Sequence, residues 1–336
     1  MSGALIRRLA RARSRVTTTV PSVALRATLI AGFMIGTTTT DARLQSLVPG
    51  HWFHKAPLPM ARSEVGIAVL ADRIYVVGGF ATDGDQRVTL EYDAARDSWR
   101  LRRPLPRGLN HVATAAYDGK LYAFGGFAQE TGAPVLDAYR YDPGGDRWSP
   151  IAPLPSPRGA SAAALIDGKI HVVGGHDRNG SVALHDIYDP ARDVWSAGPP
   201  LPVGRDHLAL VCAHERLYAI GGRIGDSGHN TERNDEYDPV SGAWTSRAPM
   251  PTARSGIAAV LYRSDILVIG GESPQGTFDN VEAYAPSSDR WTTLSALPAA
   301  RHGTGAAVVG NVLFVPAGAP LPGGSESSTM QAFSEP

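Results

Sequence analysis

Six tryptophans at nearly equal intervals constrain the fold of this chain more than any other feature. They are the only tryptophans in the sequence, and the steps between them alternate between 47 and 49 residues: Trp52, Trp99, Trp148, Trp195, Trp244 and Trp291. Pairs of glycines follow the same spacing and begin at Gly78, Gly125, Gly174, Gly221 and Gly270. A repeat of this length indicates that the chain is built from copies of one supersecondary unit.

Each repeat carries the signals of four short strands. Apolar, β-branched and aromatic residues dominate short runs such as DRIYVVGGF (residues 72–80), and Gly, Pro and Asp bound these runs. Asp118-Gly119 and Asp167-Gly168 lie between the first two runs of their repeats, and Asp-Gly pairs are typical of two-residue type I′ hairpin turns. Helical periodicity is missing outside the N-terminal tail. We therefore predict an all-β fold with one four-stranded antiparallel sheet in each repeat.

The order of these motifs resembles that of kelch-repeat β-propellers. In that family a double glycine ends the second strand, a Tyr lies in the third strand and a Trp lies in the fourth. The matching Tyr and Trp residues are Tyr92 and Trp99, Tyr141 and Trp148, Tyr188 and Trp195, Tyr237 and Trp244, and Tyr284 and Trp291. The resemblance covers residue 51 to the C-terminus and implies a propeller with six blades. We expect the glycines to make room for the rings of the Tyr and Trp residues.

The two ends of the repeat region each supply part of a blade. Residues 50–59 supply only a fourth strand, with Trp52, whereas residues 301–336 supply the first three strands, with Phe333 at the Tyr position. Ala317 stands where the other repeats have their first glycine. We expect the two ends to combine into the sixth blade, which closes the ring and removes free sheet edges.

The sequence divides into a basic N-terminal segment (residues 1–50) and the propeller (residues 51–336). The segment holds seven arginines and one acidic residue, followed by a short apolar run at 27–36, which is consistent with a signal peptide or with a disordered arm. A signal peptide implies a periplasmic or secreted protein, and a disordered arm leaves the protein in the cytoplasm. The apolar run is too short for a stable membrane span.

The charge of the propeller argues against nucleic acid as a partner. The whole chain has a net charge of zero, so the residues after position 50 carry −6 against the +6 of the tail. An acidic body does not provide the basic surface that binds phosphate backbones. Cys212 is the only cysteine, so no internal disulfide is possible. We also expect neither a cofactor nor a metal.

An arginine precedes five of the six innermost strands, 16 residues before the first glycine of the pair or before Ala317. These residues are Arg62, Arg158, Arg205, Arg254 and Arg301, and the second repeat has Leu109 there, with Arg107 two residues earlier. If their side chains face the axis, they form a ring of guanidinium groups suited to a carboxylate or phosphate. The alternative is that each arginine pairs with a carboxylate or carbonyl of the adjoining blade, and the sequence leaves both open.

Polar residues that differ between repeats are better candidates for a ligand site, because the fold itself does not require them. They gather before the innermost strands and just after the double glycines: Glu64, Asn110, His111, Asp206, His207, His302, His176, Arg223 and Glu272. From these and the arginines we predict a ligand-binding set of Arg62, His111, Arg158, Arg205, His207, Arg223, Arg254, Glu272, Arg301 and His302. His111, His207 and His302 fall on alternate blades, which makes a three-histidine metal site conceivable, but no metal is predicted.

Two classes of function fit these residues. The first is a stand-alone, exported propeller that binds a glycan, an acidic small molecule or a protein on the loop face around the central channel. The second rests on a weaker resemblance to bacterial periplasmic N-acetylneuraminate mutarotases or epimerases, which implies an acidic-sugar site. Glu64, Asp206 and His207 are then the candidate catalytic residues for proton transfer. The sequence does not decide whether the protein is an enzyme.

Overall fold

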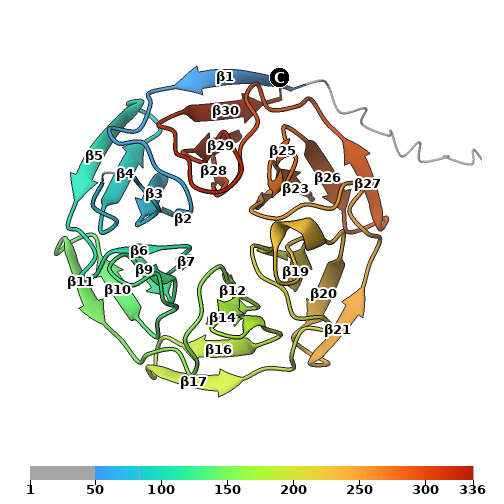
Figure 1. Cartoon of the computed structure of the whole chain (residues 1–336), viewed down its shortest axis with the longest axis horizontal. Helices are drawn as coiled ribbons and strands as arrows, with labels where there is room; N and C mark the ends of the chain where they lie inside the picture. Colours follow the sequence, from blue (N-terminus) through green and yellow to red (C-terminus); the bar gives the residue numbers. More distant parts are fainter. Residues whose placement is uncertain (1–49, 83, 336) are drawn as a thin grey trace, which may run out of the picture. The chain divides into compact units, whose positions relative to one another are not determined.

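The structure, a computed structural model, describes residues 50–82 and 84–335. Apart from Gly50, the segment predicted as a signal peptide or basic arm lies outside the described residues. The described residues form six four-stranded antiparallel sheets around a central axis (Figure 1). The prediction of an all-β, six-bladed propeller with four strands in each blade is confirmed.

Each of five blades is formed from one continuous stretch of the chain, with its innermost strand first and its outermost strand last. The first three are β2 (Gly66–Leu70), β3 (Arg73–Val77), β4 (Thr89–Asp93) and β5 (Ser98–Arg102); β7 (Ala113–Tyr117), β8 (Lys120–Phe124), β10 (Ala138–Asp142) and β11 (Arg147–Pro150); and β12 (Ala162–Ile166), β13 (Lys169–Val173), β16 (His185–Asp189) and β17 (Val194–Ala197). The next two are β18 (Ala209–Ala213), β19 (Arg216–Ile220), β20 (Asn234–Asp238) and β21 (Ala243–Ser246); and β22 (Ala258–Tyr262), β23 (Asp265–Ile269), β26 (Val281–Ala285) and β27 (Arg290–Thr293).

The sixth blade joins the two ends of the described chain, as predicted. It contains β28 (Ala307–Val309), β29 (Val312–Pro316) and β30 (Met330–Ser334), with β1 (His51–Lys55) as its outermost strand. Trp52 lies opposite Phe333 in the register of β1 and β30, with the ring centroids 5.1 Å apart. This is the same cross-strand position at which Tyr92 faces Trp99 in the first blade. The ring of Phe333 therefore packs against Trp52 as the Tyr rings of the other blades pack against their Trp residues.

The tryptophans also join neighbouring blades. The indole Nε1 of Trp99 donates to the carbonyl oxygen of Ala56 at 2.8 Å, and Trp195 and Trp291 make the equivalent bonds to Ala152 and Ala248 at 2.9 Å. Because each indole ring packs inside its own blade while its N–H reaches the blade before it, one side chain serves both contacts. The ring of blades is thus held together at its outer edge as well as at its core.

The double glycines have a different role from the one expected. A Cβ atom built on Gly125 would lie 2.3 Å from the backbone oxygen of Arg158, and one built on Gly78 would lie 2.4 Å from the backbone oxygen of Leu109. At none of the five pairs is a Tyr or Trp ring among the nearest atoms. The expectation that they make room for these rings is therefore wrong: the first glycine of each pair lets the backbone of the next blade approach, and the second lets the segment before the innermost strand of its own blade approach.

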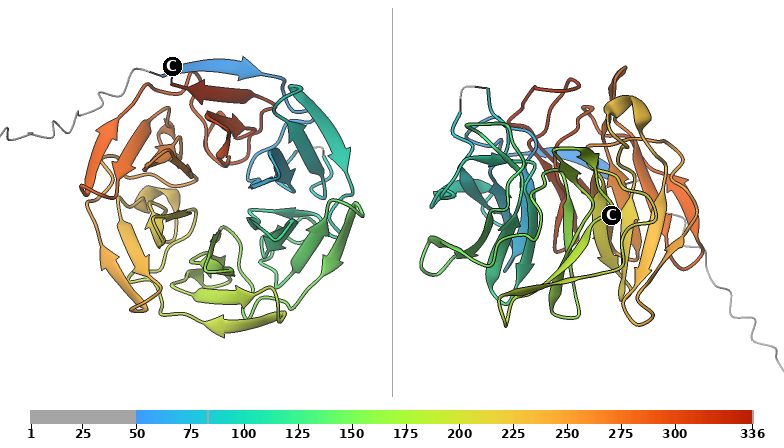
Figure 2. Two further views of the ribbon diagram at one scale, coloured as in Figure 1. Left: turned by 180° about the vertical axis from the view of Figure 1, so that it is seen from behind. Right: turned by 60° about the horizontal axis from the view of Figure 1, so that its bottom comes forward.

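Short connections place the ligand-candidate residues at one end of the central channel. The hairpin turns between the first two strands of a blade lie at the other end; Asp118 and Gly119, with φ of 47° and 70°, have the two positive values that a type I′ turn requires. At the candidate end, small ladders extend the blades: β6 (Leu109–Asn110) with β9 (Phe127–Ala128), β14 (His176–Asp177) with β15 (Gly180–Ser181), and β24 (Glu272–Ser273) with β25 (Gly276–Thr277). A short 3-10 helix, η1 (Ser227–His229), belongs to the same set of loops, and Figure 2 shows loops projecting beyond the sheets.

No helix in the described ranges is long and apolar enough to cross a membrane.

A pair of buried histidines lies where the third blade packs on the fourth. Nδ1 of His171 lies 2.7 Å from Nε2 of His185, and Nδ1 of His185 lies 3.0 Å from the carbonyl oxygen of Pro199. Because a carbonyl oxygen only accepts, Nδ1 of His185 donates, and its Nε2 accepts from His171. Both imidazoles are therefore neutral, and His185 packs edge-on against the ring of Tyr237.

This pair predicts a loss of stability in acid. Burial lowers the pKa of His171 from 6.5 to about 3, and burial also lowers the pKa of His185. The unfolded chain therefore binds these protons first, so the contribution is complete above about pH 6.5 and is lost as the pH falls toward 3. For His171 we expect a loss of about 3 kcal/mol at about pH 4.5 relative to about pH 7, because pH 4.5 lies about two units below the unfolded-state pKa. Chemical denaturation at about pH 7 and at about pH 4.5 measures this loss in the wild type and in the double variant His171→Leu/His185→Leu. An equal loss of stability in acid in the two proteins would contradict its assignment to the histidine pair.

Candidate functional site

Six residues at the same position of the six blades surround the mouth of the channel, and we call them the mouth ring. Each lies two residues after the arginine position, and all six have φ between 51° and 63°: Glu64, His111, Ala160, His207, Gly256 and Gly303. Their backbones form a belt in which the N–H of each residue from His111 to Gly303 donates to the carbonyl of the ring residue before it, at 2.8–3.1 Å. The belt closes through the N–H of Val65, which donates to Gly303 at 3.4 Å.

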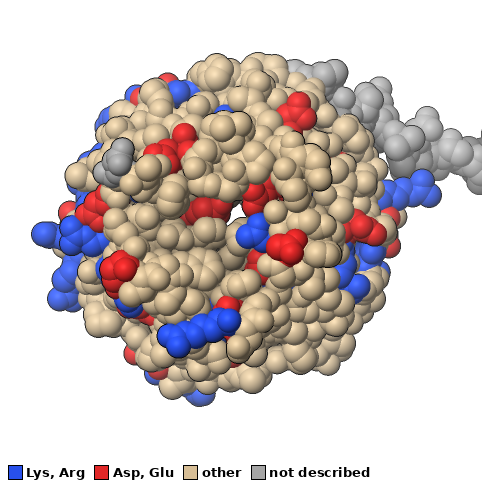
Figure 3. Space-filling model, viewed as in Figure 1, with Lys and Arg blue, Asp and Glu red and all other residues tan. Residues whose placement is uncertain are grey.

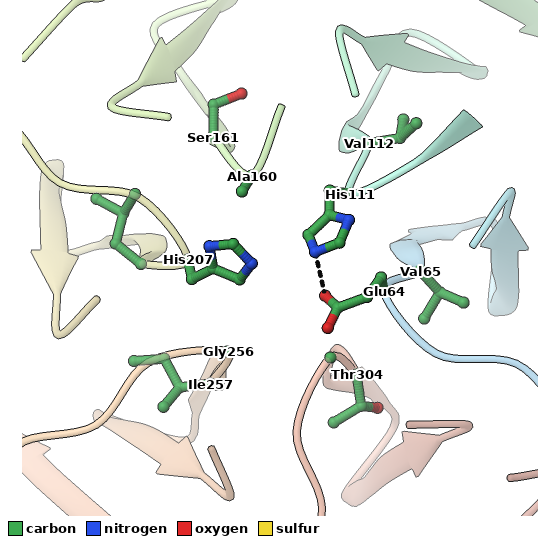
Figure 4. Close-up of a pocket in the computed structure, with 12 residues that line it drawn as sticks. Glu64, Val65, His111, Val112, Ala160, Ser161, His207, Gly256, Ile257 and Thr304 are labelled. Carbon is green, nitrogen blue, oxygen red and sulfur yellow. Dashed lines mark ion pairs between the residues drawn. The ribbon is translucent and has the colours of Figure 1, made fainter. Parts of the chain in front are cut away.

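Three members of the mouth ring carry ionisable side chains, and these side chains point toward one another over the channel (Figure 4). Nε2 of His111 lies 3.0 Å from Oε2 of Glu64, and the rings of His111 and His207 meet edge to face with centroids 4.8 Å apart. The other three positions hold Ala or Gly. The ring therefore has a polar half and an open half.

The polar half continues into the sixth blade through His302. Nδ1 of His302 lies 3.2 Å from Oε1 of Glu64, and its Nε2 lies 3.0 Å from the carbonyl oxygen of Leu321, which it contacts as a donor. His302 is only 1% exposed. It therefore contacts Glu64 from the protein interior, with almost no surface open to solvent. The two carboxylate oxygens of Glu64 thus contact two different histidines, Oε2 with His111 and Oε1 with His302.

On the other side, Asp206 organises His207. Asp206 is fully buried, and its Oδ1 accepts from Nδ1 of His207 at 2.5 Å. The second oxygen accepts from the hydroxyl of Ser181 and lies 3.2 Å from Nδ1 of His176. The predicted catalytic candidate Asp206 is therefore placed behind His207, and it orients that ring without facing the cavity.

Arg223 links these groups to Glu272, and each nitrogen of its guanidinium donates one hydrogen bond within the protein. Its Nε donates to Asp206 at 3.1 Å, its Nη1 to Glu272 at 2.8 Å and its Nη2 to Nε2 of His207 at 3.1 Å. Arg223 and Glu272 were both predicted as ligand-binding, and both border a cavity that is described below. All three donor nitrogens of Arg223 are engaged within the protein.

The surroundings set the protonation of the cluster. Burial would raise the pKa of Glu64, but the positive charge that His111 carries when protonated and the contact with His302 outweigh it and hold the pKa well below its usual range. Burial lowers the pKa of His111 to about 4. Burial also opposes protonation of His302, but its contact with Glu64 and the charge of Glu272 prevail and raise its pKa. At neutral pH the cluster therefore contains an ionised Glu64, and of its two contacting histidines His302 is more readily protonated than His111.

The five predicted arginines do not form an open ring. All are at most 2% exposed, and four of them hold the carbonyl of the residue 16 positions further along, at the first position of the glycine pair: Arg62, Arg205, Arg254 and Arg301. Arg158 holds the carbonyl of Val172 instead. Carboxylates of the same blade neutralise three of them, Arg158 with Asp186, Arg205 with Asp235 and Arg254 with Glu282. The prediction that these five bind a ligand at the mouth is therefore corrected: burial and carbonyl bonding make them structural.

A cavity of about 470 Å³ lies over the polar half of the mouth ring. The predicted residues Glu64, His111, His207, Arg223, Glu272 and His302 line it, together with Phe80 and a loop at 322–324. Figure 3 shows acidic and basic side chains at the rim of an opening in the centre of this face. The volume suits a small molecule.

Comparison with known proteins identifies the family. The model of the KLHDC2/KLHL20/DRC7 Kelch-repeats domain matches residues 48–222, and that of the Kelch motif matches residues 204–251 and 253–298. The chain belongs to the kelch-repeat family. Among solved structures, that of YjhT is similar, with a TM-score of 0.73 at 18% sequence identity over 82% of this chain and 95% of YjhT, which indicates a shared fold. No curated protein matches the sequence significantly.

Proposed function

We propose that this kelch propeller binds a small, hydroxyl-rich and non-anionic molecule, such as a neutral glycan, at the channel mouth. The observation that carries the proposal is the mouth ring itself. Glu64, His111 and His207 adopt a left-handed backbone conformation that costs a residue other than glycine roughly 1–2 kcal/mol. Two equivalent positions are glycine. Strained residues of this kind cluster at functional sites, and these three converge on a cavity of small-molecule size.

The charges around the cavity favour a ligand without a negative charge. The carboxylates of Glu64 and Glu272 border the cavity, while the guanidinium of Arg223 already makes three hydrogen bonds within the protein. A sugar carboxylate would meet two like charges there, and the charge of Arg223 is already balanced by Asp206 and Glu272. Hydroxyl groups, in contrast, can donate to Glu64 and accept from the rim.

Sugar mutarotation is a second candidate, supported by the contacts of Glu64. Ring opening of a sugar needs a base at one oxygen and an acid at another, and Glu64 is an ionised carboxylate in contact with His302, whose pKa is raised. The resemblance to N-acetylneuraminate mutarotases supports this chemistry, while the buried arginines do not support its acidic substrate.

The test is a thermal-shift and calorimetry screen of the full chain, treated with EDTA, against neutral sugars, sialic and uronic acids, and acidic peptides. A neutral ligand at about 100 times its dissociation constant should stabilise the protein by about 2.7 kcal/mol, or about 5 °C. Glu64→Gln should weaken binding about 10- to 100-fold, because a hydrogen bond to a charged group contributes about 1.5–3 kcal/mol.

Glu215→Gln is the matched control, because Glu215 is also at positive φ but is exposed in the turn between β18 and β19. It should bind the ligand like the wild type. Binding of acidic sugars alone, unaffected by Glu64→Gln, would contradict the proposal. The absence of any shift with small molecules would reject this ligand class and favour a protein partner.

A further inference from the structure

We propose that Glu64, His111 and His207 together bind one divalent transition-metal ion in the channel mouth. The three side chains each present one ligand atom, and these atoms all lie within 4.8 Å of one another. The structure groups Glu64 with two of the histidines, in place of the three-histidine set that the sequence made conceivable. The inference goes beyond small-molecule binding and does not depend on it.

The hydrogen bonds behind the two histidines orient them as metal ligands. Nδ1 of His111 lies 2.6 Å from Oδ1 of Asn110, an oxygen that only accepts, and the amide nitrogen of Asn110 donates to Gln86 at 2.8 Å. Nδ1 of His207 donates to the buried carboxylate of Asp206. In both rings Nδ1 therefore carries the proton and Nε2 carries the lone pair. Metal-binding histidines show this same outer arrangement, with the second nitrogen donating to a carboxylate or carbonyl.

The contact between His111 and Glu64 indicates that a cation belongs between them. With its proton on Nδ1, His111 directs the lone pair of Nε2 at Oε2 of Glu64, which is 3.0 Å away and is also an acceptor. Two lone pairs at this distance repel each other. A metal ion coordinated by both atoms, or a proton on Nε2, removes the repulsion, and the two explanations predict different results below.

Nε2 of His207 currently accepts from Nη2 of Arg223 at 3.1 Å. A metal ion must displace this one contact. Arg223 keeps its bonds to Asp206 and Glu272, so the guanidinium moves aside without becoming unpaired. Nε2 of His111 and Oε2 of Glu64 are already 3.0 Å apart. The ligand atoms that are further apart, by up to 4.8 Å, must approach to about 3.3 Å, the spacing set by metal–nitrogen bonds of about 2.0–2.1 Å.

The donor set selects the class of metal. Two imidazole nitrogens and one carboxylate oxygen suit zinc, cobalt and iron(II), whereas calcium and magnesium require oxygen ligands. The three ligand residues border both the cavity and the space lined by the open half of the mouth ring. Such a site has room for water or for a ligand hydroxyl in addition to the three protein ligands.

The experiment uses the full chain after EDTA treatment and dialysis. Calorimetric titration with Zn²⁺ and the visible spectrum with Co²⁺ should each show one ion per chain. We expect His111→Gln and His207→Gln to weaken Zn²⁺ binding by more than about 100-fold, and Asn110→Ala, which leaves all three ligands in place, by about 10- to 100-fold. Circular dichroism checks that each variant is folded.

His214→Gln is the matched control, since His214 is exposed at positive φ in the turn opposite the mouth. It should bind like the wild type. The absence of saturable binding, with one proton on the His111–Glu64 pair instead, would overturn the proposal, as would binding unchanged in His111→Gln and His207→Gln. Because the glycan screen uses EDTA-treated protein, glycan binding without metal binding would refute this inference alone.

Discussion

Replacing Arg254 with alanine is expected to lower the free energy of unfolding by about 3–5 kcal/mol, because it removes one partner of a buried ion pair. The guanidinium of Arg254 is fully buried, with Nη1 2.5 Å from Oε2 of Glu282, and it also donates to the carbonyl oxygens of Gly270 and Val268. The variant leaves a carboxylate that is 1% exposed without its counter-charge. Urea denaturation followed by tryptophan fluorescence measures the change.

Two comparisons test the cause. Arg87→Ala removes an exposed arginine that contacts Asp85 at 2.7 Å, and it should leave the free energy of unfolding nearly unchanged, because solvent screens an exposed ion pair. The double variant Arg254→Met/Glu282→Leu should recover part of the loss, because it removes both buried charges. A loss for Arg254→Ala as small as that for Arg87→Ala would show that the buried pair does not support the fold.

The arginines show how far the sequence could predict the structure. Their spacing of 16 residues from the glycine pair was visible, and the structure explains it, since the side chain of Arg205 reaches the carbonyl of Gly221. The direction of the side chain was not visible, because it depends on carbonyls and on carboxylates such as Asp235 that enter from a neighbouring strand. Repetition of the arginine in five of the six blades was therefore a signal for structure. The alternative interpretation foresaw pairing with carboxylates and carbonyls, but the partners lie in the same blade and not in the adjoining one.

The residues that differ between blades were the better guide to the site. Glu64, His111 and His207 were predicted from this difference, and the structure brings them together. The other half of the mouth ring was missed, because Ala160, Gly256 and Gly303 carry no functional group, although the position two residues after each arginine would have identified them. The loop at 322–324 that borders the cavity lies in the closing blade and follows no repeat signal.

Gly125→Ala is expected to destabilise the protein by about 2–5 kcal/mol. Gly125 has a φ of 61°, which costs an alanine roughly 1–2 kcal/mol, and the added Cβ would lie 2.3 Å from the backbone oxygen of Arg158 in the next blade. That oxygen already accepts from the N–H of Gly126 at 3.0 Å, so it cannot move away without loss of a bond between blades. Such overpacking adds about 1–3 kcal/mol.

Gly119→Ala separates the two contributions. Gly119 has a similar φ of 70°, but nothing lies within 4 Å of an added Cβ, so the variant should lose only the conformational term of roughly 1–2 kcal/mol. Denaturation of both variants measures the difference. If Gly125→Ala and Gly119→Ala lose the same stability, the backbone contact between blades carries no cost, and the double glycine is retained for its φ alone. Ala317 holds a φ of 62° at the equivalent position of the closing blade, so one blade accommodates the Cβ of an alanine there.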